Sequence, residues 1–173
     1  ASDVYKRQRL RNHGLIDRNK CEEFSRNSRL DALQASYGRY LLPYLEDWTE
    51  RVIKIAEYYH SEFKEFCYVP KTREHVRSVY HNYVIQTQNR NELSLYLKEN
   101  SIETKIHYPI PIVEQPAWQK LSVKSEPVPF VKKQKEEILS LPIYAELNDI
   151  EVEYVAQKVK GFFLETQLVK EAV

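Results

Sequence analysis

The chain has 173 residues, and its 26 Lys and Arg side chains nearly balance 25 Asp and Glu, which leaves a formal net charge of +1. This balance argues against a partner recognised by charge alone, such as nucleic acid or an anionic membrane, and no apolar run approaches the ~20 residues that a membrane span needs. The three glycines lie far apart and the two cysteines stand alone, so the sequence excludes glycine-rich phosphate loops and cysteine metal sites and predicts a cytoplasmic protein.

The first eight residues differ from the rest of the chain. The segment ASDVYKRQ shows no amphipathic pattern, and Met is absent from the whole sequence, including position 1. We therefore expect residues 1–8 to be a leader foreign to the fold, and the chain to be a piece of a longer protein. Residues 11–15, RNHGL, then predict a polar turn, and a charged loop without periodicity follows as far as Arg26.

A long helix is expected from about residue 30 to residue 66. Ser28 and Asp31 fit a capping box, in which side chains satisfy the free amide groups at a helix start. Apolar residues then recur every three or four positions, which is typical of a helix with one apolar stripe. Gly38 and Pro43 interrupt the pattern, and an interior proline costs about 3 kcal/mol, so we expect a bend in the four residues before Pro43.

The second half of the sequence alternates short helices and strands, which predicts a small α+β layer. β-Branched and aromatic residues mark the strands, and Asn89 and Asn148 are predicted to cap two helices. The expected elements are a strand at Val76–Gln86, a helix at Arg90–Lys98, a strand at Ile102–His107, a helical turn at Trp118–Leu121, a helix at Phe130–Leu139, an extended segment at Ser140–Tyr144, and a helix at Ile150–Phe163 that buries Val152, Val155, Val159 and Phe162.

These elements predict two parts joined by a helix. Residues 9–45 contain no sheet of their own, so we expect them to be the remnant of a larger domain that must pack on something else. Residues 46–66 form the linking helix, and residues 67–163 can close a small α+β core. Residues 164–173 are expected to be a fraying tail.

Residues 101–116, SIETKIHYPIPIVEQP, are the stretch most typical of a binding site. Because side chains alternate along a strand, His107 points away from the local apolar face at the last residue of the predicted strand. Pro109 and Pro111 force the chain out of a sheet just after the adjacent rings of His107 and Tyr108. The pattern suits the rim of a site, although a lone histidine at a strand end is more often a solvated structural residue.

Five segments together carry a resemblance that no single motif carries alone. They are RNHGL (11–15), RNSRLDALQAS (26–36), EDWTERVIKIAEYY (46–59), YVIQTQNRNELSLYLKENSIETKIHYPIPI (83–112) and ILSLPIYAELNDIEVEYV (138–155). In this order they resemble the C-terminal half of the DegT/DnrJ/StrS family, which are pyridoxal-phosphate-dependent sugar aminotransferases of fold type I. The resemblance runs from Arg9 to Phe163, and its most specific parts are N-x-R-L-D at Asn27–Asp31 and the IETKIHYPIPI block.

The resemblance implies an α/β parent protein of which this chain is a fragment, with a long kinked linking helix and a small α+β C-terminal domain. It implies pyridoxal 5′-phosphate as the cofactor and a homodimer whose active sites are shared across the interface. The implied reaction moves an amino group, with glutamate as the expected donor, to a nucleotide-linked keto-sugar. No metal is implied.

Five residues receive a role from the resemblance. Asn27 and Arg29 match the pair that reaches the cofactor phosphate of the neighbouring subunit, and a guanidinium at a helix start suits a dianion. The pattern alone favours a capping Asn27 and a surface Arg29. His107 and Tyr108 match positions that line the nucleotide-sugar pocket, and His81 matches a usual histidine for which lining the site and packing in a strand stay open.

The lysine that carries the cofactor in this family has no match here, because no lysine of this chain lies in the corresponding context. The fragment by itself is therefore expected to be inactive. A non-catalytic relative that dimerises or binds a sugar nucleotide is the alternative. The sequence also departs from the family at Ser25 and Ser101, where glycine is common, and at Pro43, where the helix is usually unbroken; a left-handed serine at position 101 would cost about 1 kcal/mol.

Overall fold

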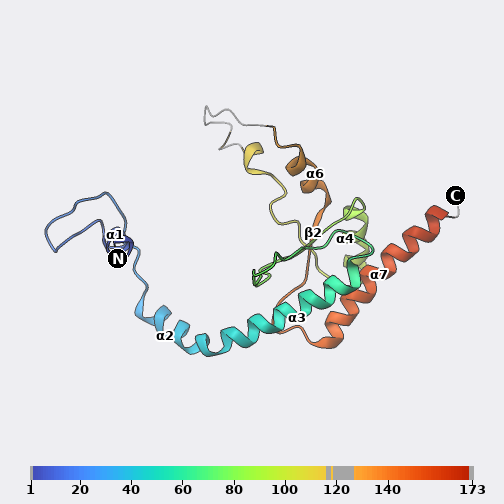
Figure 1. Ribbon diagram of the computed structural model, residues 1–173, viewed down its shortest axis with the longest axis horizontal. Coiled ribbons are helices and arrows are strands. Elements are labelled where there is room, and N and C mark those ends of the chain that lie inside the picture. The colour runs from blue at the N-terminus through green and yellow to red at the C-terminus, as the bar shows by residue number, and fades with distance from the viewer. Residues whose placement is uncertain (1, 116–117, 119–126, 172–173) are drawn as a thin grey trace. The chain divides into compact units, whose positions relative to one another are not determined.

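The computed structural model describes residues 2–115, 118 and 127–171. The chain divides into two compact units, residues 1–45 and residues 46–173. Figure 1 labels the elements of both units. The predicted helical turn at Trp118–Leu121 lies outside the described residues, apart from Trp118 itself.

The first unit consists of two helices and an irregular hairpin. Helix α1 spans Ser2–Leu10, helix α2 spans Ala32–Leu41, and the 3-10 turn η1 spans Leu42–Tyr44. Between α1 and α2 the chain doubles back, with isolated antiparallel bridges that join Asn12 to Asn27 and Leu15 to Cys21. Helix α1 therefore covers the segment whose sequence predicted no periodic structure.

The predicted capping box at the start of the long helix is wrong. Helix α2 begins only at Ala32, and its N-cap is Asp31, whose carboxylate accepts a hydrogen bond from the Leu33 amide at 2.8 Å. Ser28 instead donates its amide to the Arg11 carbonyl at 2.8 Å. The hairpin thus uses the backbone of residues 26–28, and this displaces the helix start by about one turn.

Pro43 interrupts the helix, as predicted, and the interruption takes the form of the 3-10 turn η1, after which α3 spans Leu45–Phe63. Gly38 does not interrupt it, since it lies inside α2. The predicted apolar stripe is buried only in its second half. Helix α2 buries no residue in its unit, whereas the last three turns of α3 bury Ile55, Ala56, Tyr59 and Phe63.

The second unit packs helices on a short antiparallel sheet. Strand β1 at Tyr83–Gln86 pairs with β2 at Ile138–Leu141, with Tyr83 opposite Leu141 and Gln86 opposite Ile138. Besides α3, the helices given for the described part of this unit are α4 at Arg90–Glu99, the 3-10 turn η2 at Ile112–Glu114, α6 at Pro129–Glu137 and α7 at Asp149–Glu171.

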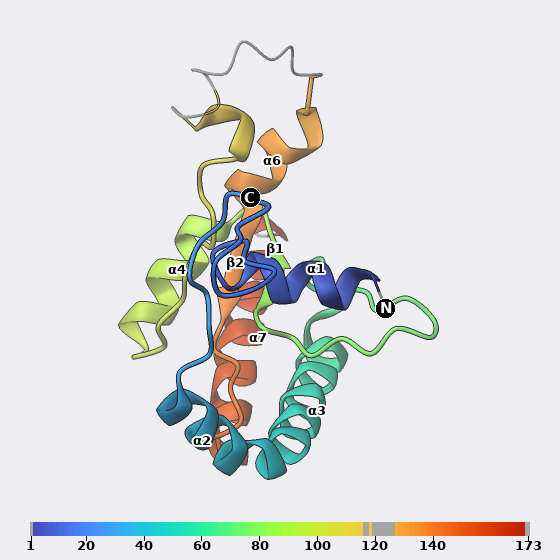
Figure 2. The same cartoon turned by 90° about the vertical axis from the view of Figure 1, so that its left-hand side faces the viewer.

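Helices α3 and α7 run side by side, as Figures 1 and 2 show from two directions. Ion pairs join Arg51 to Asp149 at 2.7 Å and Glu62 to Lys160 at 2.7 Å, so the two helices point the same way. Their inner faces, with α4 and the sheet, form the core; its largest fully buried side chains are Tyr59, Tyr83, Phe63, Ile55, Ile85, Leu93, Leu97, Leu139 and Val159. In the described part of the chain, no helix combines the length and apolarity of a membrane span.

The predicted strand at Val76–Gln86 is shortened to its last four residues. Its first part is irregular, with a left-handed Tyr80 at a φ of 45°. Strand pairing stops at Tyr83 and Leu141 because Pro142 follows Leu141 and has no amide hydrogen to donate. The same proline lies opposite Glu103, so the predicted strand at Ile102–His107 is reduced to one bridge, between Lys105 and Ser140.

The C-terminal elements keep their predicted order with shifted ends. Helix α6 gives way to β2 at Ile138, two residues before the predicted change, because the apolar run from Ile138 pairs with β1. Asn148 caps α7 as predicted: its side chain accepts from the Glu151 amide and its amide donates to Glu151, both at 3.0 Å. The predicted stripe of Val152, Val155, Val159 and Phe162 is buried, but α7 continues to Glu171 rather than ending at Phe163.

Helix α4 extends one residue past its predicted end, and the predicted capping role of the Asn89 side chain is wrong: Asn89 stands at the N-cap position but its side chain makes no capping hydrogen bond. The helix ends in a Schellman motif. The Ile102 amide donates to the Leu97 carbonyl at 2.9 Å, and the Ser101 amide donates to the Lys98 carbonyl at 3.0 Å. Ser101 has a φ of 61°, which a serine adopts only with strain, since its Cβ crowds the backbone. Ser101 therefore has the left-handed backbone for which the sequence predicted a loss of stability.

Replacing Ser101 with glycine should raise the free energy of unfolding by about 1 kcal/mol, because glycine reaches the left-handed region without a Cβ. Urea unfolding followed by circular dichroism measures the change. Ser101→Ala keeps the Cβ and should gain nothing. A glycine variant no more stable than the alanine variant would contradict this account.

The thiol of Cys67 packs against the core, and burial raises its pKa from the usual 9.0 to about 12. The unfolded chain therefore loses this proton at a lower pH than the folded protein does. The contribution of the neutral thiol to the free energy of unfolding is fully present below pH 9.0 and is lost as the pH rises towards 12. Cys67→Ala should make the decline shallower by up to about 1.4 kcal/mol per pH unit in unfolding titrations. Cys21→Ala removes an exposed thiol and should leave the slope unchanged; equal slopes in both variants would refute the assignment.

Candidate functional site

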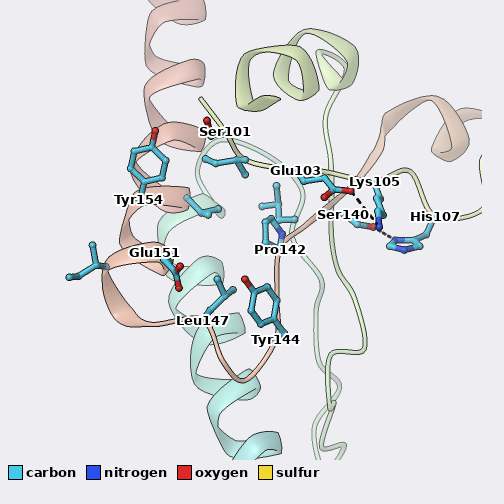
Figure 3. Close-up of a pocket in the computed structure, with 14 residues that line it drawn as sticks. Ser101, Glu103, Lys105, His107, Ser140, Pro142, Tyr144, Leu147, Glu151 and Tyr154 are labelled. Atoms are coloured by element: carbon cyan, nitrogen blue, oxygen red, sulfur yellow. Dashed lines mark hydrogen bonds and ion pairs between the residues drawn. The ribbon is translucent and has the colours of Figure 1, made fainter. Parts of the chain in front are cut away.

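His107 is held against strand β2 by the strand's one polar side chain. Its Nδ1 atom lies 2.8 Å from Ser140 Oγ, and Figure 3 shows the two side chains turned toward each other. The backbones of Lys105 and Ser140 exchange both hydrogen bonds, at 2.8 and 3.2 Å. This pairing places the odd-numbered side chains of residues 101–107 on the face of the sheet that carries Ser140.

A cavity of about 590 Å³ opens on this face of the sheet. One wall is formed by residues 101–107, a second by β2 and the loop 142–147, and a third by the start of α7 (Figure 3). Tyr144 and Tyr154 stand at its opposite sides, and Glu103, Lys105 and His107 line the remaining wall. Apolar walls with a few convergent polar groups are the usual composition of a site for a small organic ligand.

A second cavity, of about 740 Å³, lies on the other side of His107. Its described walls are residues 107–115, which include Tyr108, and side chains of α6 and β2. Lys135 stands in this wall and bonds Glu114 at 2.7 Å. That hydrogen bond raises the pKa of Lys135, so the ammonium group stays charged at the mouth of the cavity. His107 thus stands in the walls of both cavities.

Tyr108 has a strained backbone. Its φ is 63°, which is rare for an aromatic residue, and it precedes Pro109, which disfavours helical conformations of either hand at that position. Its side chain is 80% exposed, so packing does not explain the strain. Strained residues of this kind cost on the order of 1–3 kcal/mol and gather at binding sites, where the conformation itself serves the site.

Asn27 and Arg29 lie in the first unit, ahead of α2. The Arg29 guanidinium donates to the Asn12 side chain, and the backbones of Asn12 and Asn27 form a bridge. Both predicted residues are exposed and are held near each other by Asn12. They do not stand at an open helix start, because the Asp31 carboxylate already accepts from the first turn of α2.

Gly14 is required by this hairpin. Its φ is 69°, and a Cβ built at this position would lie 1.7 Å from the Glu23 carbonyl oxygen. No side chain fits there without moving the backbone. The close approach of residues 14 and 23 aligns the two arms that carry Asn12 and Asn27.

The structure does not bring His81 to the cavities. It is exposed in a bend before β1, not in a strand, and it is absent from the walls of both cavities within the described residues. Packing in a sheet therefore does not hold His81 in place. His60 and His75, which belong to the same unit, do not line the two cavities either. No cluster of three or more His, Cys, Asp or Glu side chains that could bind a metal occurs in the described part of the chain.

Sequence reasoning missed Ser140 and the two tyrosines Tyr144 and Tyr154. One signal was present for Ser140, since it is the single polar residue in the apolar run ILSL, and such a residue needs a hydrogen-bond partner when buried. Nothing in the local pattern points to Tyr144 and Tyr154. They line one cavity only because the loop after β2 returns the chain to the sheet.

Comparison with known proteins supports one family throughout. The model of the DegT/DnrJ/EryC1/StrS aminotransferase family matches residues 3–160. The match therefore begins within residues 1–8, which the sequence predicted to be a leader foreign to the fold. The chain is 34% identical over 158 residues to the pleiotropic regulatory protein of Geobacillus stearothermophilus, and this covers 89% of the chain and 42% of that protein.

A second relative is named as an enzyme. The dTDP-3-amino-3,6-dideoxy-alpha-D-galactopyranose transaminase of Aneurinibacillus thermoaerophilus is 35% identical over 156 residues, covering 88% of the chain and 42% of that protein. Among solved structures, DesV of S. venezuelae, determined in complex with a ketimine intermediate, is similar with a TM-score of 0.85 and 28% identity, covering 92% of this chain and 43% of that one. The chain spans less than half the length of these relatives.

Proposed function

Because the chain belongs to the DegT/DnrJ/EryC1/StrS aminotransferase family, we propose that the whole protein transfers an amino group, with glutamate as donor, to a keto-sugar linked to a nucleotide. The observation that carries this proposal is the family match over residues 3–160 together with the similarity to a named sugar-nucleotide transaminase. The fold expected from the resemblance, that of the C-terminal half of these enzymes, is confirmed by the likeness to DesV.

The first unit would hold the phosphate of pyridoxal phosphate. A guanidinium group has five N–H donors, and the Arg29 contact with Asn12 uses one of them, so most remain for phosphate oxygens. Residues 1–45 also carry nine Lys and Arg against five Asp and Glu, which favours a dianion. At the start of α2 the Asp31 carboxylate already accepts from the Leu33 amide, and its negative charge disfavours a second anion there. Asn27 and Arg29 therefore fit the phosphate through side chains alone, and we assign them to the cofactor of a partner subunit in a homodimer.

The second unit would hold the substrate. The cavities beside His107 are large enough for a sugar and its diphosphate, and Tyr108 presents an exposed ring in the wall of the second cavity. His107 would donate a hydrogen bond to an oxygen of the substrate, and Tyr108 would cover one of its faces. His81 is exposed and lines neither cavity. We therefore propose it only as a contact of the assembled site.

The chemistry requires groups from outside these 173 residues. Pyridoxal phosphate, when bound, supplies the electron sink that amino-group transfer needs, and a lysine must hold it and move a proton. No lysine of this chain lies in the sequence context of that residue. We therefore propose that the 173 residues bind and position, and that they are inactive by themselves.

A non-catalytic role is the second candidate, and one observation favours it. The relative from Geobacillus stearothermophilus is named a pleiotropic regulatory protein. Its identity to this chain, 34%, is close to that of the named transaminase, so identity alone does not separate the two roles. A regulator of this fold would bind a sugar nucleotide without transferring an amino group. With bound pyridoxal phosphate, a regulator would show no change in absorbance when glutamate is added, whereas an enzyme would.

With added pyridoxal phosphate, the whole protein should absorb between roughly 330 and 420 nm, and glutamate should shift this absorbance. Arg29→Ala should weaken the affinity for the cofactor about tenfold or more, because a hydrogen bond to a charged group is lost. A spectrum that glutamate does not change would favour the regulator.

The matched control is Arg26→Ala, which removes the same charge from the same hairpin but is not assigned to the phosphate. It should keep most of the affinity for pyridoxal phosphate. If Arg26→Ala and Arg29→Ala weaken binding equally, the phosphate responds to the general charge of the hairpin, and the specific assignment of Arg29 is wrong.

His107→Gln should raise the KM for the nucleotide sugar about tenfold, because one hydrogen bond to the substrate is removed. Cofactor binding, followed by absorbance, should not change. His75→Asn serves as the control, since His75 is exposed on a loop away from both cavities. An unchanged KM in His107→Gln would remove His107 from the proposed substrate site.

A further inference from the structure

Ser140 is a buried polar residue in the middle of the sheet. It is 5% exposed, and its neighbours in β2, Leu139 and Leu141, are buried apolar residues. A hydroxyl group in such a place costs stability unless it makes a hydrogen bond. Its side-chain contact among the described residues is the one with His107 Nδ1, at 2.8 Å.

The backbone of Ser140 fixes this contact. Ser140 donates its amide to Lys105 at 2.8 Å and accepts from the Lys105 amide at 3.2 Å, so the two residues stand directly opposite each other. His107 lies two residues further along the same face, within reach of the Ser140 side chain. The imidazole is therefore held by a group that cannot shift without breaking the sheet.

The direction of the hydrogen bond follows from the single proton of the hydroxyl group. If His107 Nδ1 were protonated and donated to Ser140, the hydroxyl proton would need another acceptor, and no other contact of this side chain occurs among the residues that the structure describes. If Ser140 donates to Nδ1, the buried hydroxyl proton has its acceptor, and the His107 proton on Nε2, which has no partner among the described residues, stays available to water or a ligand. A buried donor without a partner costs about 1–3 kcal/mol, so the second arrangement is favoured.

We propose that Ser140 is a positioning residue that holds His107 as the neutral tautomer with its proton on Nε2, and so turns His107 into a hydrogen-bond donor for an anionic oxygen such as that of a diphosphate. The inference deepens the proposed function, since the substrate class comes from it. The position of the Nε2 proton is a property of the chain itself and stands apart from substrate binding. Ser140 thus acts through His107 and does not touch the ligand.

Nitrogen NMR of the whole protein tests the tautomer directly. In the unaltered protein, His107 Nε2 should give a pyrrole-type signal and Nδ1 a pyridine-type signal, assigned among the histidines by the loss of both in His107→Gln. Ser140→Ala should mix the two tautomers, and Ser140→Thr, which keeps the hydroxyl group, should restore the original pattern. Ser94→Ala is the control, because Ser94 Oγ bonds Thr104 at 2.9 Å from the other face of the same segment.

Titration with uridine 5′-diphosphate and with uridine follows the ligand. The diphosphate should move the Nε2 signal, uridine should not, and Ser140→Ala should weaken diphosphate binding about fivefold to tenfold. An unchanged tautomer in Ser140→Ala, or an Nδ1 proton in the unaltered protein, would overturn the proposal. A confirmed tautomer with no response to diphosphate would instead count against the proposed substrate contact and leave the role of Ser140 intact.

Discussion

The pair of backbone hydrogen bonds between Ser140 and Lys105 is the constraint on which the candidate substrate site depends. Strand β2 pairs with β1 along one edge. On its other edge, the bridge between Lys105 and Ser140 is the single point at which residues 101–107 join the sheet. Through this point His107 meets Ser140, and the chain leaves the sheet at Tyr108 with a left-handed backbone. The proline at position 142 keeps the pairing short, and this leaves the face of the sheet open as a cavity wall.

The two units divide the proposed work between them. The first presents Asn27 and Arg29 on a hairpin whose geometry requires Gly14, and the second presents His107 between two cavities and Tyr108 in the wall of one of them. Helix α2 buries nothing in its own unit, and Leu33, Tyr37 and Tyr40 are more than 60% exposed on it. Exposed apolar side chains in such a number are typical of a surface that a partner covers, and the packing of residues 9–45 on something else stays a prediction.

The sequence was most informative where one local pattern had one physical meaning. Asn148 and Glu151 form the reciprocal cap, the valines of α7 face the core, and Pro43 interrupts the long helix. It was least informative where two local patterns competed. Ser28 and Asp31 both suit a helix start, and only the hairpin pairing of residues 26–28 removes Ser28 from the choice. Similarly, the β-branched residues from Val76 onward predict a strand whose first part has no partner to pair with.

The sequence by itself determined the family, the presence and order of α4, α6 and α7, the buried face of α7, and the choice of His107 and Arg29 as residues to examine. These follow from periodicity, from caps and from matched motifs, all of which are local in the chain. Only the tertiary structure decided that Ser28 pairs with Arg11 instead of capping α2, that Ser140 holds His107, and that Tyr144 and Tyr154 share a cavity with it. Each of these depends on residues brought together by strand pairing or by a returning loop, and such contacts leave no periodic trace in the sequence.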